Sequence, residues 1–184
     1  MNRLDIKGNR AQKNYSKWVY IKRIAWWVGR VLFTYSPRTA FGYRNMILRV
    51  FGAKIGRHVH IYPSTIIWFP WNLEIGEWSA IGEYTLIYNL GRVVIGSRST
   101  ISHKVHICAG THDYQEPTLT LLRPPIYIGD HVWICANSFV GPNVTIAEGA
   151  IIGAGAVIMR DATAWGIYGG NPAIYIKKRI LNDE

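Results

Sequence analysis

The sequence is organised by a period of six residues between positions 126 and 159. Every sixth residue from Ile128 onward is a β-branched aliphatic, in the series Ile128, Ile134, Val140, Ile146, Ile152 and Ile158. A helix repeats every 3.6 residues and a strand every two, so neither explains this spacing alone. A chain that turns one branched aliphatic inward every six residues closes a triangular coil after three units, and stacked coils bury these side chains as one core. The pattern predicts an all-β solenoid, a parallel β-helix.

The same ladder can be followed backward through the chain. It predicts about five coils within residues 53–163. The spacing continues, with steps of eight residues after Ile67 and Ile87, through the residues Ile55, Ile61, Ile67, Ile75, Ile81, Ile87, Ile95, Ile101 and Ile107. The step from Ile107 to Ile128 is 21 residues, three more than a whole coil. The hexad pattern fails over 109–125, where three prolines oppose regular structure. We therefore expect one long loop at 109–125, and excursions of this kind from a regular scaffold are usually functional.

The first 52 residues lack the period and form a basic, aromatic extension. Residues 1–57 contain 13 Lys and Arg against one acid, Asp5. Apolar residues recur at three- and four-residue spacing over 15–34, which predicts a helix, and we expect a second helix over 38–51. Residues 1–14 are expected to be a polar arm.

The extension has two compatible interpretations. It can pack on the solenoid and cover its open first coil, or its tryptophans and basic residues can meet an anionic membrane surface through 15–34. Basic residues interrupt the apolar run, so it is a poor membrane span. The polar, basic start lacks a signal-peptide cleavage site, so we expect a cytoplasmic protein, peripheral on the inner face of the membrane. Residues 164–184 are expected to be a C-terminal tail.

The chemistry-bearing candidate is His112, at the root of the long loop. Histidine titrates near neutral pH, and a histidine held by a rigid scaffold beside a loop suits a general base. Asp113 or a backbone carbonyl could orient its ring. The alternative is an ordinary surface histidine at a turn.

Several short motifs follow one another along the chain in an order that is hard to obtain by chance. They are Ile95-Gly96, Thr111-His112, the proline-containing loop, the segment 128–134 (IGDHVWI), the segment 153–157 (GAGAV) and the segment 169–173 (GGNPA). Together they resemble the hexapeptide-repeat acyltransferases, in the branch of galactoside, maltose and nodulation-factor O-acetyltransferases. The extension looks most like that of the colanic-acid type of exopolysaccharide acetyltransferase. The resemblance implies a left-handed β-helix, a homotrimer and acetyl-CoA as donor.

By this resemblance, His112 is the catalytic base for an O-acetyltransferase acting on a saccharide hydroxyl. The acyl-CoA contacts that it implies are Trp133, Ala136, Gly153, Ala154, Arg160, Asn171, Pro172 and Lys177. A backbone N–H near Ala136 is the expected oxyanion donor. The acceptor contacts that we expect are Asn89, Glu83, Tyr88 and Asp113. The chain departs from the pattern at Ala136 and Met159, where relatives often have Ser or Thr, and at Ile174 in place of an Arg.

The acceptor is expected to be an exopolysaccharide precursor that could be lipid-linked. The γ-class carbonic anhydrases share the fold and bind zinc through three histidines, but the spacings of His103, His106 and His112 do not match that pattern, so we expect no metal. A non-enzymatic binding protein is the third alternative; no nucleic-acid motif accompanies the basic segment, so we expect no nucleic-acid partner. Cys108 and Cys135 lie in no metal motif and are expected to stay reduced.

Overall fold

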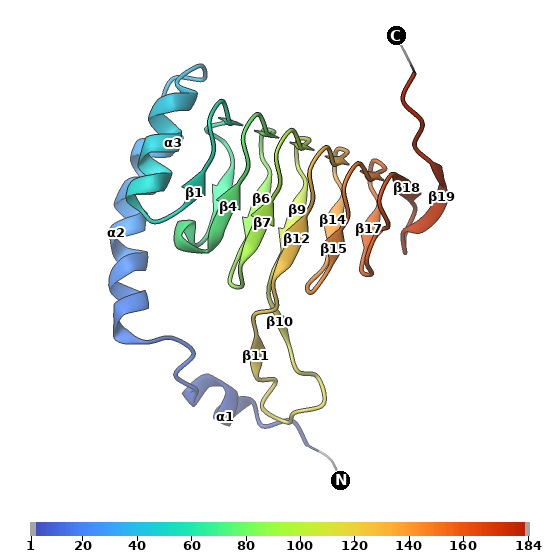
Figure 1. The fold of residues 1–184 in the computed structure, drawn as a ribbon. Helices are drawn as coiled ribbons and strands as arrows, with labels where there is room; N and C mark the ends of the chain where they lie inside the picture. The colour runs from blue at the N-terminus through green and yellow to red at the C-terminus, as the bar shows by residue number, and fades with distance from the viewer. Residues whose placement is uncertain (1–2, 183–184) are drawn as a thin grey trace.

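The computed structural model describes residues 3–182 and shows a left-handed parallel β-helix with helices at one end (Figure 1). Sheet A contains β1 (Lys54–Ile55), β4 (Leu73–Ile75), β7 (Val93–Ile95), β12 (Ile126–Ile128) and β15 (Thr145–Ile146). Sheet B contains β2 (His60–Ile61), β5 (Ala80–Ile81), β8 (Thr100–Ile101), β13 (Trp133–Ile134), β16 (Ile151–Ile152), β18 (Gly166–Gly169) and β19 (Ile174–Lys178). Sheet C contains β3 (Ile66–Ile67), β6 (Leu86–Tyr88), β9 (His106–Cys108), β14 (Phe139–Val140) and β17 (Val157–Ile158).

The ladder predicted from the six-residue period forms the core. Ile55 pairs with Ile75 and Ile75 with Ile95 on sheet A, and equivalent in-register pairs run along sheets B and C. Every predicted ladder residue is buried. The fold class is confirmed.

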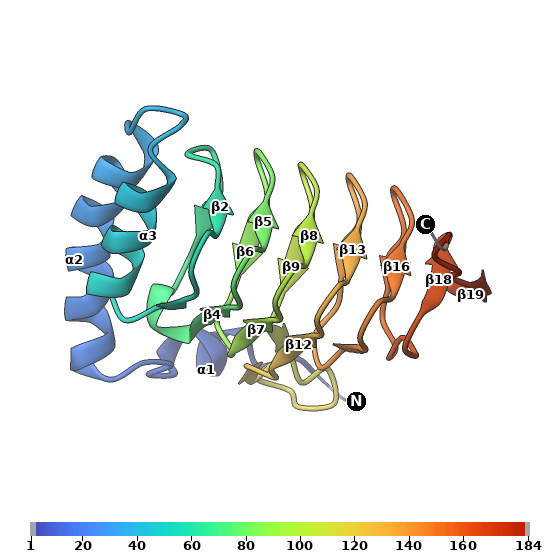
Figure 2. The same ribbon diagram turned by 45° about the horizontal axis from the view of Figure 1, so that its top comes forward.

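The solenoid has about six turns, slightly more than the five expected. Ala162 forms a bridge to Ile146, and β18 pairs in parallel with β16, so a further coil continues past residue 163. In that coil the buried residues are Ala162, Gly166 and Tyr168, and none of them is a branched aliphatic. The six-residue signal therefore fades before the solenoid ends. The antiparallel strand β19 then closes this end (Figure 2).

The helices α2 (Lys17–Thr34) and α3 (Phe41–Val50) cover the first coil, as the capping interpretation predicted (Figure 2). Trp26, Phe33, Ile47 and Leu48 are buried in the same core as the ladder. In later coils, ladder carbonyls accept hydrogen bonds from backbone N–H groups of the preceding coil. For example, the Ile75 carbonyl accepts from the Gly56 N–H at 2.8 Å. The first coil has no predecessor, so its ladder carbonyls need other donors.

Side chains of the helices supply those donors. Arg49 Nε donates to the Ile55 carbonyl at 3.0 Å, Arg44 Nε to the Ile61 carbonyl at 2.6 Å, and Trp26 Nε1 to the Ile67 carbonyl at 2.9 Å. Arg44 is fully buried, and burial lowers the pKa of its guanidinium. It also donates to the carbonyls of Pro37 and Arg38, each at 2.6 Å, which fixes the turn before α3. We call this set of contacts the cap.

Two further elements meet away from the solenoid body (Figure 1). Residues 6–11 form the short helix α1 (Ile6–Ala11) within the segment expected to be a polar arm. The segment 109–125 leaves the solenoid as expected, but it contains a β-hairpin, β10 (Thr111–His112) with β11 (Leu121–Leu122). We call this hairpin the catalytic arm because it carries His112, the base expected from the sequence. No helix among residues 3–182 has both the length and the apolar character needed to cross a bilayer.

Candidate active site

His112 lies on β10, where the chain passes from sheet C to sheet A. This C–A corner follows β9, and the catalytic arm extends from it. His112 Nδ1 lies 2.6 Å from the carbonyl oxygen of Leu119, on the opposite side of the hairpin. A carbonyl can only accept, so Nδ1 carries the hydrogen, and in the neutral ring the lone pair is on Nε2. The exposed ring is thus held in the tautomer that a general base requires.

The carbonyl that orients the ring belongs to Leu119 and not to Asp113. The Asp113 carboxylate accepts from the Gln115 N–H at 3.0 Å and so shapes the turn that follows β10. Of the two orienting groups expected from the sequence, the structure therefore places the backbone carbonyl against His112.

The tip of the catalytic arm is in contact with α1. The Asp5 N–H donates to the Pro117 carbonyl at 2.8 Å. The Asn9 side-chain amide donates to the carbonyls of Thr118 at 2.6 Å and Leu119 at 3.2 Å. No sequence signal marked this contact, because it joins positions that are about 110 residues apart.

Most of the expected donor-side residues line a second corner, where sheet B passes into sheet C. Ala136 lies at this B–C corner after β13, and Gly153 and Ala154 lie at the same corner one coil later. The Gly155 N–H donates to the Ala136 carbonyl at 2.9 Å, which stacks the two turns. Asn171 and Pro172 follow β18 and continue the stack. These small residues thus form one narrow track along the solenoid.

Trp133 lies beside this track on sheet B. Its indole is partly exposed, and Nε1 donates to Ser102 Oγ at 3.0 Å, so the ring leans toward the B–C corner. Lys177 lies on β19, where it pairs with Ile167 at the C-terminal end of the same sheet. Arg160 follows β17 and lies at the C–A corner instead, on the edge that also carries the catalytic arm.

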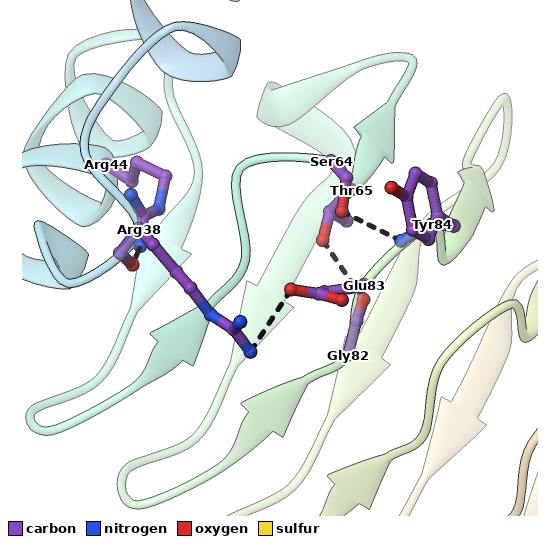
Figure 3. Close-up of polar contacts among 7 residues, drawn as sticks. All are labelled: Arg38, Arg44, Ser64, Thr65, Gly82, Glu83 and Tyr84. Atoms are coloured by element: carbon purple, nitrogen blue, oxygen red, sulfur yellow. Dashed lines mark hydrogen bonds and ion pairs between the residues drawn. The ribbon is translucent and has the colours of Figure 1, made fainter.

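The expected acceptor contacts fall in different places. Asn89 is fully buried: its amide donates to the Phe69 carbonyl at 2.6 Å and accepts from the N–H groups of Trp68 and Phe69 at 3.2 and 3.0 Å. Its side chain is engaged in holding the corner after β3, so we leave it out of the acceptor site. Glu83 lies at the B–C corner, away from His112, and its carboxylate pairs with Arg38 at 3.2 Å (Figure 3).

Tyr88 lies near the root of the catalytic arm. It pairs with Cys108 in register, and a Cβ added at Gly110 would lie 3.1 Å from its ring. Burial raises the pKa of its hydroxyl, so it stays protonated and can donate a hydrogen bond. Trp68 meets its ring edge-on at 4.8 Å.

A cleft that no sequence pattern indicated lies between α2 and the first coil. It is lined by Arg23, Trp26, Trp27, Arg30, Ile67, Trp68 and Phe69. Within the described part of the chain, neither Arg23 nor Arg30 has a carboxylate within ion-pair distance. Through Trp68 the cleft adjoins Tyr88 and thereby the root of the catalytic arm. The Arg23 guanidinium lies over the rings of Tyr15 and Phe69, 5.4 and 5.8 Å from their centroids. The indoles and guanidiniums of this cleft suit a ligand that joins a sugar-like body to an anionic group.

The remaining polar chemistry is limited. Over residues 3–182 no three His, Cys, Asp or Glu side chains gather in a group that could hold a metal ion. Burial raises the pKa of the Cys108 and Cys135 thiols, so they stay protonated near neutral pH and are poor nucleophiles. Among the expected site residues, His112 combines an exposed ring with a fixed hydrogen bond at Nδ1.

Known proteins share the sequence pattern of this chain. The sequence profile described as bacterial transferase hexapeptide (six repeats) matches residues 125–160. The chain is 37% identical over 177 residues to the Escherichia coli (strain K12) protein named as the colanic acid biosynthesis acetyltransferase WcaF, covering 96% of this chain and 97% of that one. The chain belongs to the hexapeptide-repeat transferase family and is an acetyltransferase of that family.

Solved structures share the fold. A maltose O-acetyltransferase from Clostridium difficile 630 superimposes with a TM-score of 0.81 at 22% identity, covering 98% of this chain and 100% of that one. A hexapeptide-repeat acetyltransferase from Vibrio cholerae in complex with acetyl coenzyme A gives a TM-score of 0.83 at 20% identity, covering 92% and 93% of the two chains.

Proposed function

We propose that the protein transfers an acetyl group from acetyl-CoA to a saccharide hydroxyl, with His112 as general base. The observation that carries this proposal is the bond between His112 Nδ1 and the Leu119 carbonyl at 2.6 Å. The free Nε2 takes the hydroxyl proton while the oxygen attacks the thioester carbon. The tetrahedral intermediate then breaks its C–S bond, and the imidazolium returns the proton to the departing CoA thiolate. The products are the acetyl ester and CoA.

The track of small residues at the B–C corner is the proposed place for the pantetheine arm of the donor. Gly153 and Ala154 leave room beside the coils, and Trp133 flanks the track. Lys177 and Arg160 are the proposed partners of the CoA phosphates, and Asn171 and Pro172 are placed near the adenine end. A backbone N–H near Ala136 is the proposed donor to the oxyanion.

We propose that the active site forms between copies in a homotrimer. His112 lies at the C–A corner and the donor track at the B–C corner, so sheet C separates them within one chain. If two copies place these corners against each other, the base of one chain faces the thioester held by the next. Glu83 lies at the same B–C corner as the donor track, two coils nearer the N-terminus. It would then also face the acceptor.

The acceptor that we propose is a lipid-linked precursor of an exopolysaccharide. This proposal rests on the likeness to WcaF and on the cleft that contains Arg23 and Arg30. The two guanidiniums would contact the phosphate that joins lipid to sugar, and Tyr88 and Asp113 would contact the sugar nearer to His112. Replacing both arginines by Gln should raise KM for a diphosphate-linked saccharide about tenfold and leave KM for the free saccharide unchanged. Equal effects on both acceptors would contradict this assignment.

The outer face of α2 is the proposed membrane contact. Trp18, Ile24, Trp27 and Leu32 are among its exposed apolar residues, and Lys17, Lys22 and Arg30 lie on the same helix. An apolar face with basic neighbours fits an anionic bilayer surface. Ile24→Glu should abolish the sedimentation of the protein with anionic vesicles, whereas high salt should weaken it. Salt-independent failure of the wild type to bind would overturn the proposal.

The first experiment on the activity is acetyl transfer with release of free CoA thiol, measured for the wild type and for His112→Ala. We expect His112→Ala to lose about two orders of magnitude in kcat with an unchanged unfolding midpoint. His58→Ala, at an exposed histidine between β1 and β2 and away from both corners, is the matched control and should retain activity. A fully active His112→Ala variant would show that another group removes the proton.

A further inference from the structure

We infer that Asn9 of α1 is a positioning residue for His112, because its side-chain amide holds the same carbonyl that orients the catalytic ring. The inference rests on the proposed role of His112 as the base. It assigns to the N-terminal segment a part in the reaction, separate from the capping of the solenoid by α2 and α3.

The Leu119 carbonyl oxygen is the point at which the two side chains meet. It accepts from His112 Nδ1 at 2.6 Å and from Asn9 Nδ2 at 3.2 Å. Asn9 Nδ2 also reaches the Thr118 carbonyl at 2.6 Å, so one amide binds two successive carbonyls. Leu119 has a φ of 47°, in the left-handed region that non-glycine residues rarely adopt. The amide therefore stabilises a backbone conformation that leucine would not choose unaided.

Two contacts on either side of Asn9 fix α1 against the catalytic arm. The Asp5 N–H donates to the Pro117 carbonyl at 2.8 Å, and the Asp5 carboxylate caps α1 through the Gly8 N–H at 2.8 Å. After α1, the Arg123 guanidinium donates to the Asn14 carbonyl at the root of the arm. α1 has no buried residue, so polar contacts rather than packing hold it in place.

The arm needs such support. A two-stranded hairpin without a hydrophobic face is marginally stable by itself in water. A general base must keep its geometry within about half an ångström of the productive one. Since the arm joins the solenoid only at its root, the contact with α1 at its tip preorganises His112.

The charged groups around the shared carbonyl are few. Asp5, Lys7 and Arg10 lie on the α1 side. Asp113 and Glu116 lie on the arm, and Arg123 lies at its root. A new carboxylate at position 9 would face the carbonyls of Thr118 and Leu119 and stand near the imidazole. It would repel the carbonyls and favour the protonated ring.

The test compares Asn9→Ala, Asn9→Asp and, as a matched control, Asn14→Ala, in which the backbone carbonyl that binds Arg123 is retained. We expect Asn9→Ala to lower kcat about tenfold without changing KM for acetyl-CoA or the unfolding midpoint. Asn9→Asp should lower kcat further and move the acid side of the pH–rate profile upward by about half a unit. Asn14→Ala should behave as the wild type.

Two readouts separate this inference from the proposed function. If His112→Ala is inactive while Asn9→Ala keeps the wild-type kcat and pH profile, His112 is the base and Asn9 does not position it. If His112→Ala is fully active, the proposed function fails and the inference fails with it. Side-chain ¹⁵N shifts of His112 provide a readout that is independent of turnover: we expect the Nδ1–H tautomer in the wild type and a mixture of tautomers in Asn9→Ala. An unchanged single tautomer in Asn9→Ala would overturn the inference.

Discussion

The N-terminal extension contacts the rest of the chain in two places that differ in kind. At the cap, α2 and α3 insert buried side chains and give the first coil its missing donors, with Arg44 at the centre. At the tip of the catalytic arm, α1 makes a few polar contacts and buries nothing. Contacts of the first kind stabilise the fold, because a buried acceptor without a donor costs free energy. The second kind is typical of positioning, because it can be lost without unfolding the solenoid.

The strongest way to test this difference is to break the cap. Arg44→Met keeps a long apolar side chain but removes the donors to the carbonyls of Ile61, Pro37 and Arg38. Leaving buried acceptors unpaired should lower the free energy of unfolding by about 3 kcal/mol. Urea unfolding checks this value, and Arg57→Met, at an exposed arginine, is the control. A stability loss as small as that of the control would mean that water donates to these carbonyls in place of Arg44.

Lowering the pH should have a smaller effect on the free energy of unfolding. This effect should arise in the solenoid rather than in the cap. His106 lies on β9, directly before the catalytic arm, and burial lowers its pKa below the ordinary value of 6.5. As the pH falls below about 6.5, the unfolded chain therefore takes up the proton before the folded chain does. The stability of the wild type should fall over this range.

His106→Leu should remove this part of the pH dependence. Urea midpoints at pH 7.5 and pH 5.5 measure it, with His103→Leu at an exposed position as control. An equal decline in the wild type and in His106→Leu would assign the acid sensitivity to other groups. Arg44 stays charged throughout this range, so the cap should contribute equally at both pH values.

The smallest effect is expected where the extension meets the solenoid only through exposed charges (Figure 3). Arg38 and Glu83 lie 3.2 Å apart with side chains that are 67% and 38% exposed. Exposed pairs of this kind stabilise proteins by about 0.5 kcal/mol or less, so Glu83→Gln should leave the unfolding midpoint almost unchanged. A reduced kcat in this variant, at unchanged stability, would instead support an acceptor role for Glu83.

Some parts of the molecule could be predicted from the sequence, and others could not. The ladder was predictable because each coil must bury a branched aliphatic at the same step. The root of the long loop marked His112 as the candidate base, which stays a prediction. The burial of Arg44 was not predictable, because a charged residue in a basic segment usually lies in water. The contact of the Leu119 carbonyl with His112 could not be predicted either, because every residue has a backbone carbonyl and the sequence does not single one out. Asn9 contacts it across about 110 positions, so no local pattern could reveal that contact.

The closure of the solenoid also sets the order in which it opens. Each coil rests mainly on its two neighbours, so its local stability depends on its distance from the protected end. Side chains anchor the first coil, whereas the last coil is closed by β19, whose five residues are all exposed. Thermal fraying should therefore begin at the C-terminal coil and advance toward the helices, with amide hydrogen exchange slowing in the same direction. The track proposed for the donor lies toward the end that opens first, and the catalytic arm lies near the middle of the solenoid. Entry of the donor would therefore use motion that leaves the proposed base undisturbed.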